Sequence, residues 1–316
     1  MTRRTRFILI ISSIALAGLA MALWVRSFGV SGAEFQTLFD HLILWPVVPL
    51  LALVVGHVAL SSWRWSLIEE VLSGVRPRFG PAFATGAFAQ GLGTFLPSPL
   101  VNVACRGLAN RLSGTSGLRG ALSGGIDQVA DFAVVLLLAI PAIAAFVHRD
   151  ILIYLWGCAL MVPLGLGMIF LLPTAIRWFR PPAFLRRVHD AASRFDRVTL
   201  CKLYGISLAR FISLTLMNIA VHAAIGTVTI AAILVGVPLV ALATSVAMLP
   251  GAFGISEWSF SVIFAGFSIG AADIVLFVLA NRILLTGTSL AVAAATLSIK
   301  ASGWLVGPSR RQRPDR

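Results

Sequence analysis

Charged residues are scarce in this chain of 316 residues: they make up 12% of it, against 58% for hydrophobic residues. No stretch is polar enough to form a soluble domain of useful size, so a single integral membrane domain over residues 1–316 is predicted. Acidic residues are fewer than basic ones, 12 against 25, and the net charge is +13. The basic residues stand at the ends of apolar runs, which indicates the membrane surface as their partner and not nucleic acid.

Motifs for common chemistry are also missing. The three cysteines, Cys105, Cys158 and Cys201, lack metal-ligand spacing and form no disulfide framework. A Gly-x-x-x-x-Gly-Lys run for ATP is absent, and no metal-ligand cluster or nucleophile–base pair stands out. Because no hydrolase, transferase or ATPase motif is found, we expect a protein that is not an enzyme and that holds no cofactor or metal.

Apolar runs of about 20 residues, the length that crosses a bilayer, predict six transmembrane helices. The expected spans are residues 7–25, 44–62, 121–147, 151–172, 205–235 and 272–298. The expected segments of the chain are 1–62 (spans one and two), 63–120 (a cytoplasmic segment and a first hairpin), 121–172 (spans three and four), 173–202 (a basic connection on the cytoplasmic leaflet), 203–298 (span five, a second hairpin and span six) and 299–316 (a basic tail).

Basic residues sort to one side of these spans, since only Arg26 and Arg149 fall in segments expected outside. The positive-inside rule then places both termini in the cytoplasm, and the protein in the inner (plasma) membrane. Tryptophans are expected in belts at the two interfaces, with Trp24 at an outer end. Trp63, Arg64 and Trp65 mark the inner end of the second span, with Glu69 and Glu70 following on the cytoplasmic side.

Helix breakers interrupt two short apolar segments. Leu-Pro-Ser-Pro at 96–99 interrupts a segment that runs from Pro81 to Arg106, and Leu-Pro-Gly at 249–251 interrupts one that runs from Pro238 to Gly270. Irregular backbone survives at membrane depth only if it is buried in protein or lines a wet cavity. We therefore expect two broken re-entrant hairpins. Their tips include Pro97, Pro99, Asn102, Pro250, Gly251 and Gly254.

The order of these elements repeats. Span two, the first hairpin and span three mirror span five, the second hairpin and span six, in opposite orientation. The predicted fold is therefore an all-α polytopic membrane protein with an inverted repeat. Short interrupted segments at matching positions of two halves point to a transport site near the bilayer midplane.

Ionisable residues inside the apolar segments are the candidates for that site. Glu257 follows the second breaker, and Asp127 and Asp131 are spaced i, i+4, so that both carboxylates lie on one helix face. Arg106 and Arg282 suit phosphate, because a guanidinium offers a planar fork to two oxygens. Secondary candidates are Arg210, Asn218 and His222. A structural ion-pair network that locks the hairpins is the alternative interpretation of these charges.

The second hairpin carries a recognisable motif, Leu-Pro-Gly-x-x-Gly-x-x-Glu, over residues 249–257. It resembles a motif of the lysylphosphatidylglycerol synthase transmembrane region, or flippase-like domain family, which is the lipid-flipping half of the multiple peptide resistance factor. The resemblance covers residues 63–282, without the soluble aminoacyltransferase half, and assigns the arginine that follows the motif to Arg282. In the family's first motif, Leu96, Pro97 and Arg106 match, but Asn102 and Val103 stand where Gly-Glu is expected. A third motif of the family is an acidic residue next to an arginine, followed by an aspartate. Here the corresponding residues are Asp127, Gln128 and Asp131, so that Gln128 stands where the arginine is expected.

The resemblance implies a protein that moves lipid. The leading hypothesis is a translocase for an anionic or aminoacylated phospholipid or a polyprenyl-phosphate-linked lipid, which binds at Arg106, Asp127, Asp131, Glu257 and Arg282. One alternative is an integral membrane lipid-modifying enzyme, with Glu257 or the two aspartates as acid and base. Another is a non-catalytic membrane partner of a lipid or glycan assembly machine. Expected partners are membrane lipids with an anionic headgroup, and a second copy of the chain or a lipid-synthesis protein.

Overall fold

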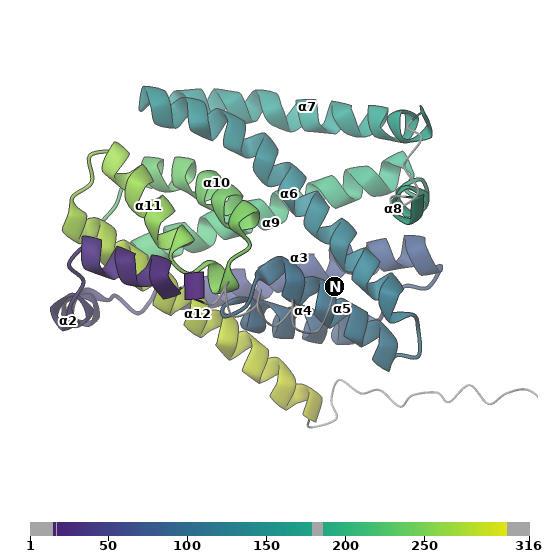
Figure 1. Cartoon of the computed structure of the whole chain (residues 1–316), viewed down its shortest axis with the longest axis horizontal. Helices are drawn as coiled ribbons and strands as arrows, with labels where there is room; N and C mark the ends of the chain where they lie inside the picture. The colour runs from purple at the N-terminus through teal and green to yellow at the C-terminus, as the bar shows by residue number, and fades with distance from the viewer. Residues whose placement is uncertain (1–14, 17, 179–185, 302–316) are drawn as a thin grey trace, which may run out of the picture.

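The computed structural model describes residues 15, 16, 18–178 and 186–301, and all regular structure in this part of the chain is helical (Figure 1). Of the expected first span, residues 15, 16 and 18–25 are described, and they are helical. Almost all of the basic tail, and part of the basic connection, lie outside the described residues. The protein is all-α, as the apolar runs predict.

The helices follow one another with short connections. In chain order they are α2 (Gly32–His41), α3 (Val47–Ser73), α4 (Phe79–Gly93), α5 (Ser98–Leu112), α6 (Gly117–His148), α7 (Ile151–Trp178), α8 (Arg186–Ala192), α9 (Arg197–Ile225), α10 (Ile230–Ala247), the 3₁₀ turn η2 (Pro250–Ala252), α11 (Ile255–Gly266) and α12 (Ala271–Ala301). Within the described ranges, α3, α6, α7, α9, α10 and α12 are long and apolar enough to cross a membrane. The chain is a multi-pass membrane protein.

Helices α4 and α5 form the first hairpin, and α10 and α11 the second, because the two arms of each pack together. With 15, 15 and 12 residues, α4, α5 and α11 are too short to cross a bilayer alone. The second hairpin begins earlier than predicted. Gly226, with a φ of 69°, ends α9, and α10 starts at Ile230, so Pro238 lies inside a helix of 18 residues. The predicted fifth span, residues 205–235, is therefore wrong. Nothing in the sequence indicates the turn, because the apolar residues continue through it without interruption.

The two hairpin tips touch each other. Gly251 has a φ of 56°, a backbone conformation that glycine adopts without steric cost, and its α-carbon lies against the carbonyl oxygen of Thr94 at the first tip. Pro97 precedes α5 as its N-cap. In each hairpin the breaker therefore lies between the two arms, at the point where this tip meets the tip of the other hairpin.

The packing of the helices repeats between the halves. In the first half α3 contacts α4 and α6, and in the second α9 contacts α10 and α12. Across the halves, α4 packs on α12, α10 packs on α6, and α3 packs on α9. Exchanging each element for its counterpart reproduces this pattern, as the expected repeat requires. Helix α7 lies outside this pattern of described contacts, along one edge of the bundle beside α6 (Figure 1).

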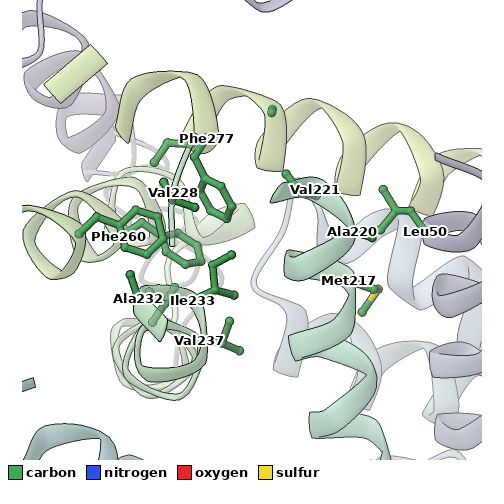
Figure 2. Packing of buried hydrophobic residues seen from close by; sticks show 14 of the residues in the cluster. Leu50, Met217, Ala220, Val221, Val228, Ala232, Ile233, Val237, Phe260 and Phe277 are labelled. Atoms are coloured by element: carbon green, nitrogen blue, oxygen red, sulfur yellow. The ribbon is translucent and has the colours of Figure 1, made fainter. Parts of the chain in front are cut away.

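An apolar core fixes the second hairpin against α12. Phe260 of α11 meets the edge of Phe277 of α12 at a centroid distance of 5.5 Å, and Phe264 meets the same ring at 5.1 Å. Ile233 and Val237 of α10 close this cluster from the other side (Figure 2). The second tip is therefore placed by its own arms and α12.

One predicted belt residue is instead part of this interior. Trp24 is completely buried, and its Nε1 donates to the Ser261 hydroxyl of α11 at 2.9 Å. The expectation that Trp24 lies at the outer interface is wrong, because this hydrogen bond and its aromatic neighbours hold it inside. Trp45 and Trp156, by contrast, are 67% and 75% exposed.

Candidate functional site

Arg64 lies at the centre of a cluster of charged side chains between α3 and α6. Its Nε donates to Asp127 Oδ1 at 2.5 Å, and its two terminal nitrogens pair with the carboxylate of Asp131, one of them at 2.8 Å. Arg64 and Asp127 have no exposed surface. One guanidinium thus bridges two carboxylates, which is possible because residues four apart share a face of α6.

Two further arginines reach the same aspartates from other helices. Arg106 of α5 pairs with Asp127 Oδ2, and Arg210 of α9 pairs with Asp131. Arg210 also donates to His57 Nε2 at 3.0 Å. Because arginine can only donate, this nitrogen accepts and the His57 ring is neutral. Three arginines and two aspartates leave the cluster with one excess positive charge, which favours an anionic ligand nearby.

A separate ion pair stands at the second hairpin. Arg282 of α12 donates from Nε to Glu257 Oε1 at 2.8 Å and from Nη1 to the carbonyl of Gly251 at 2.8 Å. Its guanidinium also lies over the ring of Phe253, 4.3 Å from the centroid. Glu257 is 2% exposed. Arg282 therefore satisfies both the buried carboxylate and an irregular backbone carbonyl at the broken tip, as membrane-embedded backbone requires.

The two halves build these contacts in the same way with the signs exchanged. In the first half the second hairpin arm carries the cation and the next span the anion, in the pair Arg106–Asp127. In the second half the arm carries the anion and the span the cation, in the pair Glu257–Arg282. Each hairpin is thereby bonded to the span that follows it.

A cavity of about 390 Å³ lies between the two clusters. Thr94, Ser98 and Asn102 of the first hairpin line it, and Gly251 and Ser256 of the second face them. The spans add charged and amide side chains to its wall: Gln128, Asp131, Arg210, Asn218, Asn281 and Arg282. The cavity therefore joins both hairpin tips and both charge clusters.

Four side-chain atoms in this wall are buried without a hydrogen-bond partner among the described residues. They are His57 Nδ1, Arg210 Nε, Asn218 Oδ1 and Asn281 Oδ1. Buried polar atoms in proteins are almost always bonded to protein, water or ligand. Two donors, His57 Nδ1 and Arg210 Nε, and two acceptors thus remain available to a polar molecule in the cavity.

A comparison with known protein families agrees with this membrane architecture. The family model for the lysylphosphatidylglycerol synthase TM region matches residues 10–293. The chain belongs to this family. Among curated proteins, none matches the sequence. Membership and the membrane-crossing helices together indicate a function connected with membrane lipids.

Of the residues predicted for the site, most lie in the wall of the cavity. These are Asp131, Glu257, Arg282, Arg210, Asn218, Pro99, Asn102 and Gly251. Arg106 and Asp127 are bonded to each other behind the wall. His222, Pro97, Pro250 and Gly254 do not line the cavity. Gly254 instead packs against Ala20 of the N-terminal helical segment.

Arg64 is the main residue that the sequence interpretation missed. The sequence predicts it at the inner end of the second span, but α3 continues to Ser73 and Arg64 is buried. Glu69, also expected on the cytoplasmic side, is 4% exposed and accepts from Asn110 Nδ2 at 2.8 Å. The available signal was the absence of a helix breaker between Trp63 and Gly74. From α3, Arg64 provides a cation to both aspartates of α6.

Proposed function

We propose that this member of the family is a translocase for an anionic or aminoacylated phospholipid or a polyprenyl-phosphate-linked lipid. The observation that carries the proposal is the cavity between the two hairpin tips, with charged and amide side chains in its wall that include Arg210 and Arg282. Charged side chains inside a bundle of apolar spans are costly, and they usually mark a site that a polar group enters. The lipid headgroup is that group.

The wall offers the chemistry that a phosphate-containing headgroup needs. The Arg210 and Arg282 side chains are 11% and 22% exposed, so each guanidinium presents part of its edge to the cavity. Guanidinium groups bind phosphate oxygens through charge-assisted hydrogen bonds and stay charged when desolvated. The Asp131 carboxylate, 27% exposed, is available to the amine of an aminoacylated headgroup.

The repeat supplies a way to move the headgroup. In transporters with inverted repeats, one half rocks against the other around a site at their interface, and access alternates between the two membrane faces. Here the cavity lies between the hairpins of the two halves. We place the protein in the inner membrane with both termini in the cytoplasm, where it exchanges lipid between leaflets, driven by a gradient or by downstream consumption of the lipid. It converts no lipid, and its partners are the lipids themselves.

Reconstitution in liposomes tests this function. Purified protein is incorporated with a headgroup-labelled fluorescent phosphatidylglycerol, and the loss of signal to an impermeant quencher reports transfer between leaflets. We expect Arg282→Gln to slow transfer about tenfold or more, since a charge-assisted bond to phosphate contributes about 1.5–3 kcal/mol. Arg119→Gln, at an exposed arginine of α6, is the matched control.

Two results would contradict the proposal. One is transfer by the wild-type protein no faster than in protein-free liposomes, for every lipid class named. The other is chromatographic detection of a chemically altered lipid after incubation, which would favour the enzyme alternative instead.

A further inference from the structure

A second hollow adjoins the cavity at the tip of the second hairpin. It is a groove of about 890 Å³ between the N-terminal helical segment and both hairpin tips. The tip residues divide between the two spaces: Gly251 and Ala252 line the cavity, whereas Pro250 and Phe253 line the groove. This short turn therefore lies between the cavity and the groove.

The groove is more apolar than the cavity. Met21, Ala22 and Val25 of the N-terminal segment form one wall, and Phe95 and Leu96 of the first tip form another. Of the residues that line it, only Arg26 is charged. A volume of 890 Å³ falls within the roughly 300–1,000 Å³ of small-molecule sites. The groove therefore suits a hydrocarbon chain along its apolar walls, with Arg26 as its one charged lining residue.

The wall formed by the N-terminal segment is fixed in place. Besides the bond from Trp24 to Ser261, Trp258 Nε1 of α11 donates to the carbonyl of Ala20 at 3.2 Å. Phe28 meets the edge of the Trp258 ring at a centroid distance of 6.0 Å. These contacts hold residues 18–30 against α11 and leave their other side facing the tips. The groove is thus preformed.

The boundary between the two spaces is amphipathic. Phe253, which lines the groove, lies under the guanidinium of Arg282, which lines the cavity. A molecule that fills both spaces has a polar end beside Arg282 and an apolar part beside Phe253. In a membrane, a phospholipid has this form.

We propose that the groove holds one acyl chain of the lipid whose headgroup enters the cavity. This inference rests on the proposed function and extends it, because the protein then recognises the chain as well as the headgroup. The chain accompanies the headgroup inside the protein, in place of trailing through the bulk bilayer. Recognition of hydrocarbon makes chain length and shape part of the specificity.

Photolabelling tests the proposal without requiring transport. The full-length protein in nanodiscs receives a phosphatidylglycerol with a diazirine on one acyl chain, and labelled peptides are mapped by mass spectrometry. We expect labels on residues 18–30 and on Phe95 or Leu96. Two variants fill the groove: Ala22→Phe, and Gly18→Leu one helical turn away, where an added β-carbon meets nothing within 4 Å. Leu23→Phe is the control, since Leu23 is 49% exposed and does not line the groove.

The filled variants should lose about fivefold or more of the groove label, because a packed space admits no chain, whereas Leu23→Phe should retain it. Equal labelling in the filled variants and the control would overturn the proposal, provided that they elute and melt like the wild type. Wild-type transport rates in both filled variants, with the label lost, would also overturn it, because the chain would not belong to the transported lipid. If the groove is labelled but the wild-type protein transports nothing, the proposed translocase function fails and the lipid-chain site stands.

Discussion

Replacing Arg64 by methionine should destabilise the protein more than any exposed arginine variant. Methionine keeps much of the side-chain volume but removes the charge between Asp127 and Asp131. Both Arg64 and Asp127 have side chains without exposed surface, so water cannot replace the lost partner. Removing one member of a buried ion pair costs about 3–5 kcal/mol, because the remaining charge is left uncompensated. Arg106 and Arg210 still contact the aspartates, which favours the lower end of this range.

Equilibrium unfolding in detergent measures this difference. Arg76→Met is the matched control, since its guanidinium is 48% exposed and lies 3.7 Å from Glu70 in an exposed pair. Its free energy of unfolding should change by about 0.5 kcal/mol or less. Adding Asp127→Asn to Arg64→Met should destabilise the protein further, because the buried Arg106 then loses its carboxylate partner as well.

An equal free energy of unfolding in Arg64→Met and Arg76→Met would refute this reasoning. It would mean that the two aspartates do not depend on Arg64 for compensation, and that the cluster is not an ionised network. Recovery of stability in the double variant would refute the narrower claim that Arg106 depends on Asp127 for compensation.

Three further predictions concern the hairpins and the orientation of the chain. Gly251→Ala should slow lipid transfer and lower the melting temperature, because its β-carbon would collide with the first tip and a φ of 56° disfavours alanine; an unchanged melting temperature would contradict the contact between tips. Glu257→Gln should slow transfer about tenfold with little change in melting, since glutamine still accepts from Arg282 but removes the charge, and wild-type transfer would exclude a role for that charge. A reporter fused after Lys300 should be cytoplasmic and one inserted at Asp150 external. An external reporter after Lys300 would mean that the second hairpin crosses the membrane.

Most of the architecture follows from two sequence signals. Apolar length gives the spans, and a proline or glycine inside a short apolar run gives the broken hairpins. Both depend on local properties, since lipid requires each backbone group to be satisfied within its own segment or its close neighbours. The turn at Gly226 could not be predicted, because the residues on both sides of it are as apolar as those of a membrane span. The burial of Trp24 could not be predicted either, because its hydrogen-bond partner, Ser261, lies 237 residues further along the sequence.

The site was predictable in part for the same reason. Asp131, Glu257 and Arg282 stand out because an ionisable residue in an apolar run is conspicuous. Arg64 does not, because it follows a tryptophan and precedes acidic residues, as a residue at the end of a span does. Only the length of α3 and its packing beside α6 show that it lies inside the bundle. Partner choice among three arginines depends on tertiary packing and leaves no trace in local sequence.

The ion pairs differ in what they connect, and this bears on how the halves can move. Arg106–Asp127 and Glu257–Arg282 each lie within one half, so they remain intact when the halves rock against each other. Among the ion pairs of the described residues, only Arg210–Asp131 joins the two halves, and both of its members line the cavity. A phosphate that binds Arg210 competes with Asp131 for the same guanidinium. Headgroup binding in the proposed translocase therefore acts on the ion pair that joins the two halves, which links occupancy of the cavity to the proposed rocking of the repeat.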